Sequence, residues 1–132
     1  MKTELCAYSV EACLCAARLG VNRVELCASP AEGGVTPSVA TIERVARIEG
    51  LDVSVMIRSR GGDFLYSDEE FQTMLRDIEH AREAGATGVV FGLLTAEGNV
   101  SSERVCATSE RSTSMGTAVG RSTCLENCTR ST

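Results

Sequence analysis

Two cysteines and a methionine occupy comparable positions in apolar segments of the chain. Cys6 and Cys27 are each the third residue of the repeated tetrapeptide Glu-Leu-Cys-Ala, and Met56 lies in a later apolar segment. Thiolate and thioether sulfurs are soft ligands that select Cu(I). If these segments are neighbouring strands, their sulfurs can meet around one ion, so we expect a copper site at Cys6, Cys27 and Met56. The alternative is that both cysteines are small buried apolar side chains.

A carboxylate and two arginines suggest a second kind of chemistry. Glu25 and Cys27 stand two apart, so both point to one face of a strand. Guanidinium groups and glycine amides can hold a phosphate or a carboxylate. The candidate catalytic residues are Glu25, as a general base, and Arg58. The candidate anion-binding residues are Arg58, Arg60, Gly61, Gly62, Gly33 and Gly34.

Each of these charged and glycine positions also has a simpler interpretation. Glu25 and Arg58 can form an ion pair that fills the protein interior. The pair Gly33-Gly34 can be a plain turn, since glycine readily adopts positive φ.

The elements that position these residues alternate between strand and helix. Apolar segments predict strands at residues 3–8, 22–27, 51–57 and 88–94. Helices are expected after the N-capping serines Ser9, Ser38 and Ser67. They are expected to stop at Gly20, Gly50 and Gly85. Repeated βα units with nearly continuous apolar strands predict a parallel sheet covered by helices.

Composition excludes several classes of protein. The 132 residues are about the size of one domain, and the net charge of −5 comes without the basic face of a nucleic-acid binder. No stretch approaches the roughly 20 apolar residues of a membrane span. Glu4 interrupts the start of the chain where a signal peptide is apolar, so we expect a cytoplasmic protein that binds neither nucleic acid nor membrane.

The character of the chain changes near residue 100. Of the 32 residues from 101 to 132, 13 are Ser or Thr, and the few apolar residues follow neither helical nor strand spacing. Such a segment buries too little apolar surface to offset its ordering entropy. We therefore expect a first domain at 1–100 and a disordered, Ser/Thr-rich tail at 101–132. The abrupt change also suggests that a reading-frame change has replaced the natural continuation.

Three motifs resemble one known family. They are Glu-Leu-Cys-Ala-Ser-Pro-Ala-Glu-Gly-Gly-Val-Thr-Pro-Ser at 25–38, Val-Met-Ile-Arg-Ser-Arg-Gly-Gly-Asp-Phe at 55–64 and Gly-Val-Val-Phe-Gly-Leu-Leu-Thr at 88–95. Over residues 1 to about 100 the chain is similar to the CutC copper homeostasis family. The resemblance implies a cytoplasmic TIM-type βα barrel of roughly twice this length, associated with copper tolerance and handling.

The chain departs from the family pattern in two places. Arg58-Ser59-Arg60 stands where the family usually has Arg-Pro-Arg, and the family's second half has no counterpart here. We therefore predict an α/β fold, a TIM-type barrel truncated to about four βα units, with a non-globular C-terminal tail. One copy of such a chain cannot close an eight-stranded barrel.

Three functions are compatible with these residues. The first is Cu(I) binding or trafficking in the cytoplasm, as copper homeostasis implies. The second is a barrel enzyme acting on a small anionic substrate, since barrel enzymes place their chemistry at the carboxyl ends of strands. The third is an inactive truncated product of the family. In each case the open edge of the fourth strand, at residues 88–94, and the uncovered strand faces predict self-association.

Overall fold

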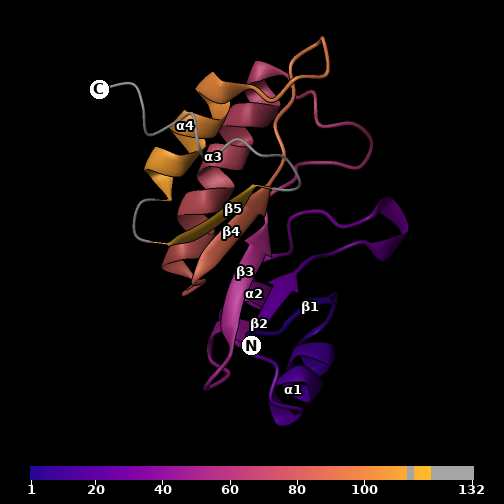
Figure 1. Ribbon diagram of the computed structural model, residues 1–132, viewed down its shortest axis with the longest axis vertical. Coiled ribbons are helices and arrows are strands. Elements are labelled where there is room, and N and C mark those ends of the chain that lie inside the picture. Colours follow the sequence, from indigo (N-terminus) through magenta and orange to yellow (C-terminus); the bar gives the residue numbers. More distant parts are fainter. Residues whose placement is uncertain (113–114, 120–132) are drawn as a thin grey trace.

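The described residues of the computed structural model, 1–112 and 115–119, form a parallel sheet flanked by helices (Figure 1). The strands are β1 (Glu4–Ala7), β2 (Arg23–Leu26), β3 (Asp52–Met56), β4 (Gly88–Phe91) and β5 (Gly116–Val119). The helices are α1 (Val10–Arg18), α2 (Val39–Ala46), α3 (Asp68–Glu83) and α4 (Ser102–Arg111), with a short 3₁₀ helix at Pro30–Glu32. All four strand pairings are parallel.

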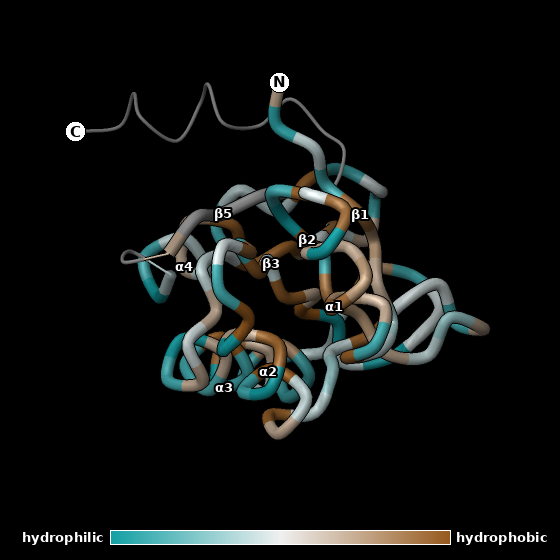
Figure 2. The backbone as a smooth tube through the Cα atoms, turned by 90° about the horizontal axis from the view of Figure 1, so that it is seen from below, coloured by the Kyte–Doolittle hydropathy of each residue, from teal (hydrophilic) through white to brown (hydrophobic). Residues whose placement is uncertain are grey.

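The strands lie in the sheet in the order in which they occur along the chain. Seen end-on in Figure 2, α1, α2 and α3 lie together on one side of the row of strands. Right-handed crossovers that always step in the same direction produce this arrangement, because each returns over the same face of the sheet. A sequential strand order with helices on one face is the layout of a TIM-type barrel wall, as the sequence predicts.

The predicted helix starts are confirmed in all three cases. The Ser9 hydroxyl accepts a hydrogen bond from the Ala12 amide at 3.1 Å, and the Ser38 hydroxyl accepts one from the Thr41 amide at 3.2 Å. Ser67 and Glu70 form the expected capping box at the start of α3. These caps satisfy amides that the first helical turn leaves without partners.

The core lies between the sheet and the helices. One face of the strands supplies fully buried apolar side chains, namely Val24, Leu26, Val53, Val55, Val89 and Phe91. Against it α3 packs its predicted stripe of Phe71, Met74, Leu75, Ile78 and Ala81, all of which are buried. Because side chains alternate along a strand, the opposite face carries Cys6, Glu25 and Met56. The chemistry-bearing side chains are therefore directed away from the helices.

The segment after residue 100 differs from the prediction. Instead of being disordered, these residues form α4 and then β5, which pairs with β4. The predicted open edge of the fourth strand is therefore covered, and the prediction of an exposed edge there is wrong. Val105 and Thr108, three residues apart, are buried, and the Thr108 hydroxyl donates to the Arg104 carbonyl at 2.7 Å. The polar Thr108 side chain thus occupies a buried position at which helical periodicity predicts an apolar residue. The rest of the predicted tail, residues 113–114 and 120–132, lies outside the described residues.

Within the described ranges, every helix is too short or too polar to cross a lipid bilayer.

Candidate metal centre

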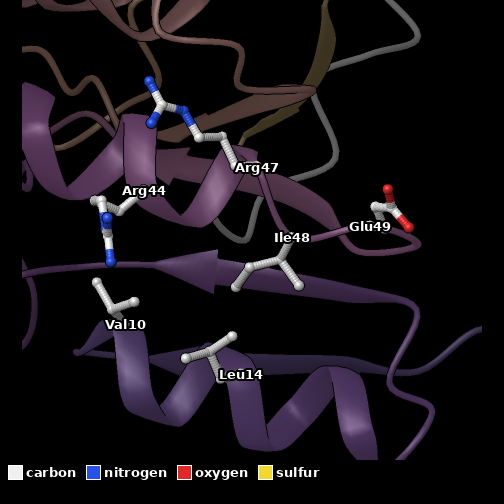
Figure 3. Close-up of a pocket in the computed structure, with 6 residues that line it drawn as sticks. All are labelled: Val10, Leu14, Arg44, Arg47, Ile48 and Glu49. Carbon is white, nitrogen blue, oxygen red and sulfur yellow. The ribbon is translucent and has the colours of Figure 1, made fainter.

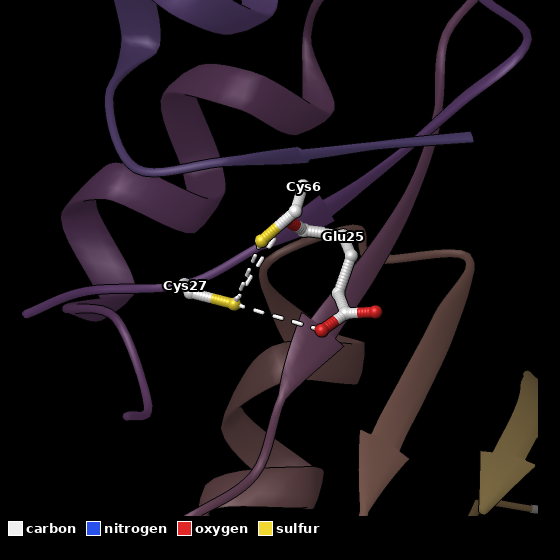
Figure 4. A group of neighbouring side chains, drawn as sticks. All are labelled: Cys6, Glu25 and Cys27. Atoms are coloured by element: carbon white, nitrogen blue, oxygen red, sulfur yellow. Dashed lines mark hydrogen bonds between the residues drawn. The ribbon is translucent and has the colours of Figure 1, made fainter. Parts of the chain in front are cut away.

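Cys6 and Cys27 are brought together by the pairing of β1 with β2. Cys6 lies opposite Glu25 in the register, and Cys27 follows the last residue of β2. The Cys27 amide continues the ladder by donating to the Ala7 carbonyl at 2.9 Å. As a result the two sulfur atoms are 3.9 Å apart, and neither cysteine is in a disulfide (Figure 4).

Glu25 completes a group of three donors. Its Oε1 lies 3.8 Å from the Cys27 sulfur, and one ligand atom from each of Cys6, Glu25 and Cys27 lies within 4.8 Å of the others. Cys27 is buried, Glu25 is half-buried and Cys6 is exposed. The Cys27 side of the group is thus buried in the protein, and the Cys6 side is accessible to solvent.

Electrostatics at this group favour an added positive charge. Burial raises the pKa of the Cys27 thiol, and the neighbouring Cys6 and Glu25 raise it further. Burial also raises the pKa of Glu25, with a further contribution from the charge of Glu4. Both pKa values rise because the charged forms of Cys27 and Glu25 would be partly removed from water without a neighbouring positive charge. A bound cation would supply that positive charge, and its binding would release the thiol protons.

Met56, the third predicted copper ligand, lies on the next strand. Its β3 position pairs with Val90, and it is half-buried on the same sheet face as Ser54. Ser54, two residues before Met56, is paired with Glu25. Met56 therefore lies further toward the carboxyl ends of the strands than Glu25, on the same face of the sheet. The role of Met56 as a ligand stays a prediction.

Tyr8 is a neighbour of this group that the sequence search missed. A β-carbon built on Gly34 would lie 3.2 Å from the Cys27 sulfur and 3.7 Å from the Tyr8 hydroxyl, so tyrosine and thiol flank the same glycine. A hydrogen bond to Cys6 and the negative charge of the Cys6 thiolate raise the pKa of the Tyr8 hydroxyl. The signal was available, because Tyr8 stands two residues after Cys6 and alternation directs it to the same side.

Arg58 is buried, and its guanidinium bonds within the protein, so its predicted catalytic role stays a prediction. It is 7% exposed, and its Nη1 donates to the carbonyls of Glu32 at 2.7 Å and Gly34 at 2.8 Å. Its Nη2 donates to the Gly62 carbonyl at 2.7 Å, and its guanidinium stacks over the Phe64 ring. Arg58 therefore bonds to backbone carbonyls, in place of the predicted alternative of an ion pair with Glu25.

Arg60 is similarly engaged. Its Nε donates to Glu70 Oε1 at 2.8 Å, and its Nη2 donates to the Leu65 carbonyl at 2.8 Å. Further bonds go to Gly61 and Asp63. In the structure these donors of the two arginines hold the loops after β2 and β3, because glycine-rich loops leave carbonyls unpaired, and a long planar cation can reach several of them. Anion binding by these residues stays a prediction.

The predicted glycines occupy turns within these two loops. Gly33, Gly34 and Gly62 have φ angles of +80°, +100° and +85°, which favours the alternative of plain turns. Gly61 instead gives room to a neighbour, since a β-carbon there would lie 3.1 Å from Oε1 of Glu32.

A separate hollow of about 370 Å³ lies between α1 and α2 (Figure 3). It is lined by Val10, Leu14, Arg44, Arg47, Ile48 and Glu49. These side chains belong to the helix layer, whereas the sulfur and carboxylate donors lie on the other face of the sheet. The hollow is therefore distinct from the candidate metal centre.

Known proteins resemble the chain over most of its length. CutC proteins from Salmonella paratyphi B and Bacteroides thetaiotaomicron are 48% identical over 102 residues and 55% identical over 98 residues. The matches cover 77% and 74% of this chain but 41% and 39% of the relatives, so the chain spans about two fifths of their length.

Solved structures agree with this resemblance. A CutC from Streptococcus agalactiae, described as a copper homeostasis protein, superposes with a TM-score of 0.83 at 31% identity, over 90% of this chain and 59% of that one. A phosphonomutase from Burkholderia cenocepacia, at 16% identity and a TM-score of 0.62, shares the fold alone. The sequence model of the CutC family matches residues 1–130, beyond the predicted limit near residue 100. With nearly every residue matched, the chain belongs to the CutC family.

Proposed function

We propose that this chain binds Cu(I) through Cys6 and Cys27 in the cytoplasm, as part of copper homeostasis. The observation that carries the proposal is the 3.9 Å separation of two free cysteine sulfurs on adjacent strands. Thiolates are the ligands that Cu(I) prefers. The description of the Streptococcus agalactiae relative as a copper homeostasis protein supports the same reading.

The difference in exposure between the two cysteines suits an ion that is passed on. Cys27 is 2% exposed and fixes one end of the site, whereas Cys6 is exposed at the strand edge. A thiol of a donor or acceptor molecule can approach the ion from the Cys6 side. Met56 is proposed as an additional soft ligand from the neighbouring strand.

The alternative of an enzyme for small anions needs arginine donors that are open to a substrate. Arg58 and Arg60 use their donors on carbonyls and on Glu70 within the protein. These contacts therefore favour copper binding over the enzyme alternative. We also propose that copies of the chain associate through the β1 edge of the sheet, where Leu5 is 45% exposed.

The copper proposal is tested by competition with a chromophoric Cu(I) chelator under anaerobic, reducing conditions. We expect the wild-type chain to retain one Cu(I) per molecule and the variant Cys6→Ser/Cys27→Ser to retain none. The matched controls are Cys15→Ser, which is exposed like Cys6, and Cys13→Ser, which is buried like Cys27. The same stoichiometry in the double variant and the wild type would refute the proposal.

A further inference from the structure

We propose that Glu25 is a third metal ligand and that Cys6, Glu25 and Cys27 together also bind Zn(II), with a fourth coordination position open to solvent. The inference shares the two thiols of the proposed copper function and extends the range of ions that the site accepts. It concerns a carboxylate donor, which copper binding by two thiolates does not require.

The distances among the three donors support this geometry. With a zinc–sulfur bond of about 2.3 Å and tetrahedral angles, two thiolates on one ion lie about 3.8 Å apart. A thiolate and a carboxylate oxygen on the same ion lie about 3.6 Å apart. The observed separations are 3.9 Å between the sulfurs and 3.8 Å between the Cys27 sulfur and Glu25 Oε1 (Figure 4). The third pair, Cys6 and Glu25, has donor atoms within 4.8 Å of each other, so these two side chains must move closer together to reach the same ion.

A linear arrangement suits the two sulfurs less well. Two bonds of about 2.3 Å in line would separate the sulfurs by about 4.6 Å, more than the observed distance. The shorter separation corresponds to a bent sulfur–metal–sulfur angle. A bent angle leaves coordination space on one side, and Glu25 lies within reach of that space.

Glu25 itself lacks the partner that a half-buried carboxylate normally has. Its acidic neighbour Glu4 forms an ion pair with Arg23. Among the described residues no basic side chain forms an ion pair with Glu25; its recorded side-chain contact is with Cys27. A carboxylate that is partly desolvated and unpaired by a cation is costly unless a positive charge joins it. A divalent ion held between Glu25 and the thiols removes that cost.

The three donors distinguish Zn(II) from Cu(I) by their ligand preferences. Zn(II) is a borderline ion that accepts sulfur and carboxylate oxygen together, whereas soft Cu(I) gains little from a carboxylate. Three protein ligands with an open position are the donor number of zinc sites that also hold a water molecule. Exposed Cys6 leaves the solvent side free for that water. Glu25 is thus the residue that sets the preference between Zn(II) and Cu(I).

Titration with Co(II), followed by displacement with Zn(II), tests the inference on the reduced chain. Co(II) serves as a visible stand-in for Zn(II), because thiolate ligation gives charge-transfer bands and four-coordination gives strong visible bands. We expect one Co(II) per chain with both signatures, and full displacement by Zn(II). A wild-type chain that binds Cu(I) but gives no thiolate–cobalt band would overturn the inference and leave the copper proposal standing.

The variant Glu25→Gln tests the assigned ligand, because glutamine keeps the shape and loses the carboxylate. We expect its Zn(II) affinity to fall at least about tenfold. Its Cu(I) affinity should stay within about threefold of wild type, since the thiolates remain. Glu32→Gln is the matched control, as an exposed glutamate of the adjoining loop outside the donor group. Unchanged Zn(II) affinity in Glu25→Gln, or equal losses of both ions, would contradict the assignment, provided that the thermal unfolding curve matches wild type.

Discussion

The candidate metal centre depends on how closely the loop after β2 returns to Cys27. Gly34 has a φ of +100° and is buried, and a β-carbon there would lie 3.2 Å from both Cβ and Sγ of Cys27. Its carbonyl accepts a hydrogen bond from Arg58. One residue without a side chain thus sets both the path of the loop and the free space beside the thiol.

Replacing Gly34 with alanine should weaken copper binding as well as stability. The left-handed backbone should cost about 1–2 kcal/mol of unfolding free energy. The new methyl group would also displace the Cys27 sulfur, so a lower Cu(I) affinity is expected in the chelator competition. Gly20→Ala is the matched control, because Gly20 also has a positive φ of +77° but nothing lies within 4 Å of its added carbon. Equal Cu(I) affinities in the two variants would show that the contact with Cys27 does not matter.

Single residues also show how far the sequence carries the prediction. Alternation along strands correctly directs Cys6, Glu25 and Cys27 to one face, and the register then brings their donors together. The same alternation includes Tyr8, the last residue of the predicted strand at 3–8, although it is not among the predicted site residues. The partners of Arg58 could not be predicted, because they are backbone carbonyls whose positions depend on the path of two loops.

At the level of elements, Arg58 joins the loop after β2 to the loop after β3. Its guanidinium donates to the carbonyls of Glu32, Gly34 and Gly62, which belong to both loops. Its own backbone pairs with Thr36, whose amide donates to the Arg58 carbonyl at 3.0 Å. These bonds hold the loop that carries Gly34 over the metal centre.

The variant Arg58→Ala should lose about 3 kcal/mol of unfolding free energy, because three carbonyls, including that of buried Gly34, lose a charged donor. The loss is measured by urea unfolding, with exposed Arg44→Ala as the control for removing an arginine. Both Nη groups of Arg58 already donate within the protein, its Nε is buried, and Arg60 bonds to Glu70 and nearby carbonyls. Inorganic phosphate should therefore leave the wild-type melting temperature unchanged. Stabilisation by phosphate that disappears in Arg58→Ala would instead favour the anion site.

Elements differ in how well local sequence determines them. The start of α3 follows from Ser67 and Glu70 alone, and its apolar spacing is complete. The helix α4 lacks that spacing, and its position depends on distant contacts, such as Arg104 donating to the Tyr66 carbonyl at 2.7 Å. Arg104 also stacks over the Phe71 ring. Periodicity cannot reveal long-range partners of this kind, so the sequence predicts a disordered tail where the structure has a Ser/Thr-rich helix.

At the level of the whole molecule, the described sheet has an open edge at β1. The strand order places β1 at the end of the sheet, and Leu5 within it is 45% exposed. An edge strand with an exposed apolar side chain is a template for pairing with another chain. The chain spans about two fifths of the length of its CutC relatives, in which further segments are present.

The wild-type chain should therefore associate in a concentration-dependent manner, as measured by size-exclusion chromatography with light scattering. Leu5→Lys should shift the distribution toward the monomer, because a charged side chain on an edge strand opposes pairing. Leu19→Lys is the control, since Leu19 is also exposed but follows α1 rather than lying on the edge. A wild-type chain that stays monomeric at every concentration would contradict association through this edge.

We propose that Cys6 and Cys27 hold Cu(I) between β1 and β2. X-ray absorption spectroscopy at the copper edge tests it most directly, because the first coordination shell distinguishes sulfur from nitrogen and oxygen. For the chain loaded with one Cu(I), we expect a shell of at least two sulfurs, which disappears in Cys6→Ser/Cys27→Ser and persists in Cys15→Ser. A first shell made only of nitrogen or oxygen, or a sulfur shell unchanged in the double variant, would contradict it.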